Sequence, residues 1–201
     1  MVRKFLSLKV LRSILRCFFF IFYDRKYLTG VYFDKKCMGW LWAFRSLRCR
    51  LFGENRKVPW PVHPRTLVSG SERIFFEPDV LHIFQVPGCY WQAHDATITV
   101  GKNCHVAPNV GIITTNHDIC NPAKHVKGED IVISNDCWIG MNAMILSGVI
   151  LGEHTIVAAG AVVTKSFPEG YCVIGGTPAK IIKCLDKQEC ELTLKGDIEK
   201  K

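Results

Sequence analysis

A period of six residues between Ile133 and Val163 constrains this chain more than any other feature. Branched apolar side chains recur at every sixth position, at Ile133, Ile139, Ile145, Leu151, Val157 and Val163. Small side chains follow four residues after each of the first five, at Cys137, Ala143, Val149, Thr155 and Ala161. A period of six fits neither a helix nor a single strand, whereas hexapeptide repeats build a parallel β-helix. The pattern predicts a mainly β, three-sided coil with the branched residues pointing inward and the small residues at the bends.

The repeat extends upstream and is interrupted once. Val100, Val106 and Ile112 keep the spacing of six, but Ile112 and Ile133 are 21 residues apart, which is not a multiple of six. The segment between them therefore contains an insertion, and regular solenoids carry their function on such insertions. We also expect glycines to supply positive φ at or near the corners. The period of six places three glycines at or near corners: Gly140, Gly152 and Gly160.

Charge separates the N-terminal segment from the repeat. Up to Trp60, fourteen basic residues stand against three acidic ones, a net charge of +11, so the rest of the chain carries −3 of the total of +8. The 48% apolar content is sufficient for a packed core and argues against a disordered chain. Because the basic residues are interleaved with aromatic ones, we interpret this segment as a membrane-surface element and expect no nucleic-acid partner.

Cysteine usage and hydropathy predict a cytoplasmic protein. The ten cysteines include no CxxC pair and no metal-ligand spacing, so we interpret them as reduced, small apolar residues and expect no metal. No segment reaches the ~18 apolar residues of a spanning helix. The apolar run CFFFIFY is followed by no small-residue cleavage site, which argues against a signal peptide. Peripheral attachment to the inner face of the cell membrane remains compatible with these features.

Two N-terminal segments have the pattern of amphipathic helices. In residues 1–23 the apolar side chains step by three or four, at Phe5, Leu8, Leu11, Leu15, Phe18 and Phe22. The second segment, residues 35–52, has the same helical spacing of apolar side chains. Two compatible roles stay open for them, capping the end of the β-helix and contacting a membrane. The predicted organisation is a helical segment with linker at 1–64, a β-helix at 65–184 and a polar tail at 185–201.

The ends of the β-helix are expected to be irregular. The looser apolar pattern of residues 73–92 predicts irregular first coils of the β-helix, with aromatic side chains in their walls. After Val163 the count of six lapses, and we expect a last strand at residues 171–174, a Gly-Gly turn and a basic run. The tail from Leu185 predicts a short helix or a frayed end.

Four motifs stand out in residues 109–180: the spacing from Asn109 to His117, Trp138-Ile139-Gly140, Val163-Thr164-Lys165, and Gly176-Thr177-Pro178-Ala179-Lys180. In combination they resemble the hexapeptide-repeat acetyltransferases, particularly the maltose and galactoside O-acetyltransferases and their relatives in capsule and O-antigen loci. The resemblance covers residues 88–184. It implies a left-handed β-helix, a homotrimer with active sites between subunits, and acetyl-CoA as acyl donor. The first seventy residues depart from the helical region that helps to build the acceptor site in the sugar enzymes.

His117 is the predicted catalytic residue. It opens the insertion, and histidine suits a general base near neutral pH, although a lone loop histidine is more often an ordinary surface residue. The resemblance implies that His117 takes the proton from an acceptor hydroxyl, which attacks the thioester without an acyl-enzyme. The acceptor residues implied are Gln92, Asn116, Asp118, Tyr90 and Trp91. Whether Asn116 and Asp118 orient His117 or the acceptor stays open, as does a core role for Tyr90 and Trp91.

The resemblance also implies a donor site. The residues implied in acetyl-CoA binding are Trp138, Gly140, Met141, Ala159, Thr164, Lys165, Lys180 and Lys183. Backbone N–H groups from Trp138 to Met141 would stabilise the oxyanion. The three lysines match positions that meet the CoA phosphates, a role that suits a compact point charge; the alternative is that they are only solvated.

Three other functions are alternatives. A γ-type carbonic anhydrase would need three histidines on zinc, a role for which His94, His117 and His125 are the candidates. A catalytically silent trimeric scaffold is the second, and a serine acetyltransferase, whose long helical N-terminal domain has no counterpart here, is the third. We therefore expect an O-acetyltransferase that acts on a sugar or lipid-linked glycan in surface-polysaccharide biosynthesis.

Overall fold

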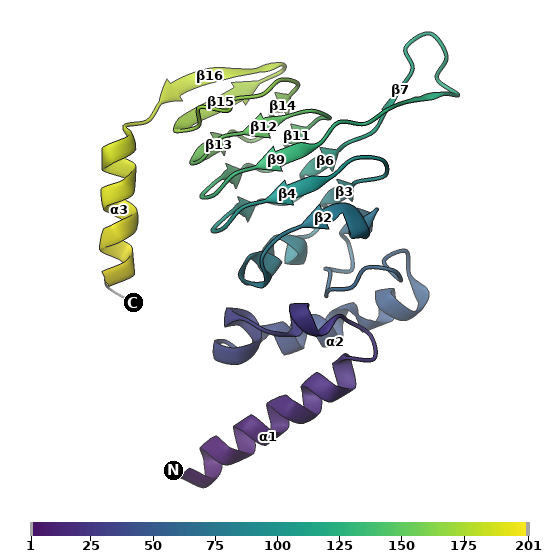
Figure 1. Cartoon of the computed structure of the whole chain (residues 1–201), viewed down its shortest axis with the longest axis vertical. Helices are drawn as coiled ribbons and strands as arrows, with labels where there is room; N and C mark the ends of the chain where they lie inside the picture. Colours follow the sequence, from purple (N-terminus) through teal and green to yellow (C-terminus); the bar gives the residue numbers. More distant parts are fainter. Residues whose placement is uncertain (1, 200–201) are drawn as a thin grey trace.

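The computed structural model contains a three-sided parallel β-helix, with helices beyond its N-terminal end and a C-terminal helix beside it (Figure 1). It describes the backbone of residues 2–199 and the side chains of residues 9–193. The helices are α1 (Val2–Phe19), η1 (Arg25–Leu28), η2 (Val31–Lys35), α2 (Met38–Phe52), η3 (Ser71–Arg73), η4 (Pro78–Gln85) and α3 (Lys187–Glu199). The predicted fold class, a left-handed parallel β-helix with an N-terminal helical segment, is confirmed.

Three sheets form the sides of the prism. Sheet A contains β1 (Leu67–Ser69), β3 (Tyr90–Gln92), β6 (Gly111–Ile113), β11 (Met144–Ile145) and β14 (Val162–Val163). Sheet B contains β2 (Ile74–Phe75), β4 (Ile98–Val100), β9 (Ile131–Ile133) and β12 (Ile150–Leu151). Sheet C contains β5 (His105–Val106), β10 (Trp138–Ile139), β13 (Thr155–Val157), β15 (Cys172–Gly176) and β16 (Ala179–Cys184). The chain visits B, C and A in turn, so three repeats close one coil.

The predicted inward columns are confirmed. All six branched residues are at most 1% exposed, and all five small residues are fully buried. Because one coil takes 18 residues, each branched residue stacks on its counterpart in the next coil. Ile139 pairs with Val157 and Ile145 with Val163, in each case 18 positions apart. The period of six is therefore the register of the whole prism.

The interruption of the repeat is a hairpin at the corner between sheets A and B. Ile98 pairs with Ile131, 33 residues further on, which is one coil of 18 plus 15 extra residues. The extra residues include β7 (Asn116–His117) and β8 (His125–Val126), an antiparallel pair outside the three sheets. Figure 1 shows this hairpin projecting away from the prism.

The corners differ from the prediction, because between Ile98 and Val163 polar residues supply five of the seven positive φ angles. These residues are Asn103, Asn109, Asp136, Asn142 and His154. Gly160 also has positive φ, as expected, but Gly140 and Gly152 do not. Their role is close stacking: a Cβ on Gly140 would lie 2.6 Å from the backbone nitrogen of Ala159, and one on Gly152 would collide with the carbonyl of Pro168. Asparagine and aspartate tolerate the left-handed region better than other side-chain-bearing residues.

Helices and aromatic rings close the N-terminal end of the prism. In the expected irregular first coil, η4 packs against β5 at the edge of sheet C. Below it, Tyr32 contacts His82, and Phe19 at the end of α1 packs edge-on against Phe44 of α2, with ring centroids 4.6 Å apart. The side chains of Phe5 and Leu8 lie outside the described residues. Among the described residues, no helix combines the length and apolar character that a membrane span needs.

The C-terminal end corrects the expected Gly-Gly turn. Gly175 pairs with Lys180 and Gly176 with Ala179, so both glycines belong to β15 and the basic run forms the antiparallel strand β16. The turn is at Thr177–Pro178. A Cβ on Gly175 would lie 2.6 Å from Cδ1 of Ile182, so this glycine allows the two strands to pack closely. The tail then forms α3.

Candidate active site

The hairpin β7–β8 presents two histidines side by side. His117 pairs with His125 across the hairpin, and their ring centroids are 4.4 Å apart. Both residues are exposed. The position follows from the register, because the fifteen extra residues must leave the prism at the corner between β6 and β9.

One hydrogen bond sets the tautomer of His117. Its Nδ1 lies 2.7 Å from the carbonyl oxygen of Pro122. A carbonyl can only accept, so Nδ1 carries the hydrogen in this contact. In the neutral ring Nε2 is then unprotonated and free to accept a proton from another molecule. A ring fixed at one nitrogen and open at the other is the arrangement that a general base requires.

Asp118 holds the turn that carries this carbonyl. Its Oδ1 accepts hydrogen bonds from the N–H groups of Cys120 and Asn121, each at 2.8 Å, and its own N–H donates to the carbonyl of Lys124. The Asp118 carboxylate thus organises the turn that presents the Pro122 carbonyl to His117. Asn116 is exposed on β7 beside His117.

Gln92 joins sheet A to the base of the hairpin. Its Oε1 accepts from the N–H of Thr115 at 3.2 Å, and its carbonyl accepts from the N–H of Thr114 at 3.0 Å. Strand alternation turns Tyr90 and Gln92 outward from β3 on the same side, and Tyr90 is partly exposed. These two side chains and the hairpin lie near one corner.

Trp91 corrects the predicted acceptor site. It is fully buried, and its ring lies 4.6 Å from that of Phe84 in the core. Because alternate residues of a strand point to opposite faces, Trp91 must point inward when Tyr90 and Gln92 point outward. Its ring cannot stack on a sugar, so the alternative of a core residue holds.

Asp95 is a site residue that sequence reasoning missed. Its carboxylate accepts from the N–H of Gly128 at 2.8 Å and from the hydroxyl of Thr115 at 3.0 Å, so it ties both stems of the hairpin together. The hydrogen bond from Gly128 is the main cause that lowers the pKa of Asp95. Asp130 makes the reciprocal contact with the N–H of Thr97 at 2.7 Å. Both contacts span 33 residues, the offset of the strand pairing, and this offset is the signal that could have found them.

The predicted donor residues fall in three places. Thr164 and Lys165 follow β14 at the corner between sheets A and B, which also carries the hairpin. The corner between sheets C and A holds Gly140, Met141 and Ala159. Sheet C itself carries Trp138, Lys180 and Lys183. In a triangular prism the A–B corner lies opposite sheet C, so one chain does not bring His117 and Trp138 together.

Sheet C presents an aligned outer row. Trp138, which is 53% exposed, pairs with Ile156, which pairs with Val173, which pairs with Lys183. The row thus runs from an exposed indole to a lysine. The N–H of Gly140 donates to the carbonyl of Val157 at 2.8 Å. Coil stacking therefore takes up this backbone donor, and Gly140 cannot supply the oxyanion contact that the motif implied.

The zinc alternative finds no preformed centre within one chain. Within residues 9–193, no three histidine, cysteine, aspartate or glutamate side chains are grouped to hold a metal ion. His94 lies beside Ser69, with Nε2 3.4 Å from the hydroxyl oxygen, whereas His117 and His125 stack on the hairpin.

Comparisons with known proteins agree with this architecture. Residues 130–165 match the family model described as bacterial transferase hexapeptide, six repeats. Galactoside O-acetyltransferase of Escherichia coli is 33% identical over 99 residues, 47% of this chain and 48% of that protein. A 2,3,4,5-tetrahydropyridine-2,6-dicarboxylate N-acetyltransferase of Staphylococcus aureus is 44% identical over 85 residues, 42% of this chain and 32% of that protein. The chain thus spans about half or less of these relatives.

The solved structures add a likeness in fold alone. A variant of AntD, an N-acyltransferase from Bacillus cereus crystallised with a dTDP-sugar and coenzyme A, matches with a TM-score of 0.50 at 12% identity. The match covers 69% of this chain and 87% of that one. The resemblance of the chain to hexapeptide-repeat acetyltransferases is confirmed by the family model and the relatives.

Proposed function

We propose that this chain is an acetyl-CoA-dependent O-acetyltransferase that acts on a sugar hydroxyl in surface-polysaccharide biosynthesis, with His117 as general base. The observation that carries the proposal is the 2.7 Å contact from His117 Nδ1 to the Pro122 carbonyl, which leaves Nε2 free. In the proposed organisation residues 65–184 are the acyltransferase domain, residues 1–64 make peripheral membrane contact in the cytoplasm, and residues 185–201 are a tail.

In the proposed reaction, Nε2 of His117 removes the proton of the acceptor hydroxyl as its oxygen attacks the thioester carbonyl. The carbon–sulfur bond then breaks, the acetyl group stays on the sugar oxygen, and the proton on His117 passes to the leaving thiolate. A hydroxyl is a weak nucleophile at neutral pH, and a positioned base contributes about 10²–10⁴-fold. Pro122 and Asp118 act as positioning residues, because they hold the ring and its turn.

A homotrimer would complete the site. His117 and Trp138 lie on opposite sides of one prism, so a neighbouring copy is needed to bring sheet C against the hairpin. In this arrangement Lys165, Lys180 and Lys183, all exposed, are available to CoA phosphates. Gln92 and Tyr90 face outward near the hairpin and are proposed to contact the sugar. The galactoside O-acetyltransferase relative supports a sugar acceptor.

The test is acetyl transfer by the purified full-length chain. Thiol release from acetyl-CoA would be followed with soluble sugars, nucleotide sugars and lipid-linked glycans as acceptors, and the acetylated product identified by mass. We expect release that depends on one glycan class and a trimer in sedimentation. Neither binding nor turnover of acetyl-CoA would favour the silent scaffold, and stoichiometric zinc with CO₂ hydration would favour the carbonic anhydrase.

A further inference from the structure

The outward side of α1 exposes a continuous apolar stripe. Its members are Val10, Leu11, Ile14, Phe18 and, just beyond the helix, Ile21, each between 42% and 74% exposed. At 100° per residue these positions fall within an arc of about 100°. The opposite side of the helix, which includes Phe19, packs on α2. A contiguous exposed apolar surface of this kind marks a binding surface.

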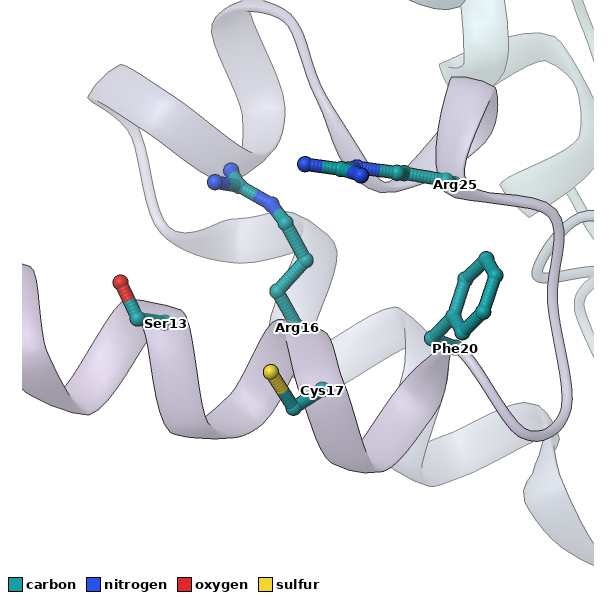
Figure 2. Close-up of a pocket in the computed structure, with 5 residues that line it drawn as sticks. All are labelled: Ser13, Arg16, Cys17, Phe20 and Arg25. Carbon is teal, nitrogen blue, oxygen red and sulfur yellow. The ribbon is translucent and has the colours of Figure 1, made fainter.

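A pocket of about 420 Å³ borders this stripe. Its lining residues are Ser13, Arg16, Cys17, Phe20 and Arg25. Figure 2 shows the guanidinium groups of Arg16 and Arg25 both reaching into the space above α1. Cys17 follows Ile14 by three residues on the helix, so the pocket and the stripe share an edge.

The charge in the pocket is positive, and one of its two guanidinium groups, that of Arg16, is held in place by hydrogen bonds. Nη2 of Arg16 lies 2.7 Å from Oδ1 of Asp34, and its Nε donates to the carbonyl of Leu28 at 3.2 Å. The second oxygen of Asp34 accepts from the N–H of Gly30 at 2.9 Å. One carboxylate therefore stands against two guanidinium groups. Guanidinium forks match phosphate oxygens in pairs, and an anchored fork loses less freedom on binding.

We propose that this pocket binds the phosphate of an anionic membrane lipid while the apolar stripe of α1 enters the headgroup–acyl boundary. Charge complementarity selects the anion, and the adjoining stripe selects a lipid, because a soluble anion would leave that apolar surface in water. Figure 1 shows α1 at the opposite end of the molecule from the hairpin, so docking leaves His117 accessible. The inference rests on the proposed peripheral membrane contact and is independent of the chemistry at His117.

Co-sedimentation of the full-length chain with phosphatidylcholine vesicles, with and without phosphatidic acid, tests the proposal. We expect binding that needs phosphatidic acid and weakens at high salt. Arg25→Gln should weaken binding about fivefold, the factor that corresponds to about 1 kcal/mol per cation near the surface. The vesicle affinity of Arg25→Lys should lie between those of the parent chain and Arg25→Gln, because lysine keeps the charge without the fork. The matched control is Arg65→Gln, at an exposed arginine outside the pocket.

A second pair of variants tests the apolar stripe. Ile14→Gln combined with Ile21→Gln should weaken vesicle binding by more than about tenfold, whereas Leu192→Gln, an equally exposed position on α3, should not. Circular dichroism confirms that each variant is folded.

Three results would overturn the inference: no binding of the intact chain, equal loss in Arg25→Gln and Arg65→Gln, or unchanged binding in the stripe variant with full competition by inorganic phosphate. Loss of acetyl transfer with intact vesicle binding would count against the proposed activity alone.

Discussion

The inward-facing residues of the regular coils (residues 131–163) and the aromatic cluster of Trp60, Phe76, Phe84 and Trp91 are both buried, but the two regions are built by different rules. In the coils every inward residue meets a counterpart 18 positions away, as Ile139 meets Val157. In the cluster the ring centroids approach within 4.6–5.0 Å at no repeating spacing. The coils are stabilised as a sum of like neighbours, whereas the cluster depends on one set of complementary shapes.

The same contrast between repeating and irregular structure explains where the candidate active site lies. A coil that repeats offers the same surface at every level, so a distinctive site needs a departure from the repeat. The hairpin is that departure, and its stems are held by Asp95 and Gln92 from the coil below. A rigid prism with one irregular corner can hold a base in place without a large core around it.

The largest expected effect comes from breaking the aromatic cluster. Phe84 is fully buried among the other three rings, so Phe84→Ala should leave a cavity that irregular neighbours cannot refill. We expect a loss of about 3–5 kcal/mol in the free energy of unfolding. Urea unfolding followed by tryptophan fluorescence measures it. A loss below about 1 kcal/mol would show that the cluster adapts as easily as a repeat.

A smaller effect should come from separating two coils by one methyl group. In Gly152→Ala the new Cβ would meet backbone atoms of Pro168 and Gly170, which cannot move without shifting the next coil. We expect a loss of about 3 kcal/mol, the upper part of the range for overpacking. At Gly160 a Cβ meets nothing within 4 Å, but φ is +70°, so Gly160→Ala should cost only about 1 kcal/mol of strain. Equal losses in thermal unfolding would contradict close stacking at Gly152.

Acid should affect the junction of the two regions through His82. Its Nε2 lies 3.3 Å from Nδ1 of His105 on sheet C, and burial, with the charge of His105 second, lowers the pKa of His82 to about 4. An unfolded histidine titrates near 6.5, so the unfolded chain binds more protons between these values. The contribution of His82 to the free energy of unfolding is therefore fully present above about pH 6.5 and is lost as the pH falls toward 4.

The partly exposed ring limits this contribution to about 1–2 kcal/mol. His82→Gln should flatten the dependence of unfolding free energy on pH over that range, whereas His94→Gln should leave the slope of the parent chain. The same slope in His82→Gln would assign the acid sensitivity to another group.

Much of the fold could be predicted because its contacts repeat in the sequence. The period of six located the inward columns and the insertion without any knowledge of tertiary contacts. The corners were harder, since Asn142 and His154 adopt a conformation for which glycine is the usual expectation. The C-terminal turn was misplaced because Gly175 and Gly176 serve strand packing, a requirement that only the neighbouring strand reveals.

The position of the candidate site could be predicted from the sequence, but the groups that hold it in place could not. The insertion identified His117, and strand alternation alone would have turned Trp91 inward. The Pro122 carbonyl and the Asp95 carboxylate could not be predicted, because both contacts depend on how fifteen extra residues fold back on the coil.

The irregular corner of the prism is proposed to supply the general base. Steady-state kinetics of the intact chain, His117→Ala and His94→Ala, with acetyl-CoA and the preferred glycan, test it most directly. His117→Ala should lower kcat by about 10²–10⁴ with little change in acetyl-CoA affinity, while His94→Ala, an exposed histidine outside the hairpin, should keep the kcat of the intact chain. An unchanged kcat in His117→Ala would show that His117 is not the base.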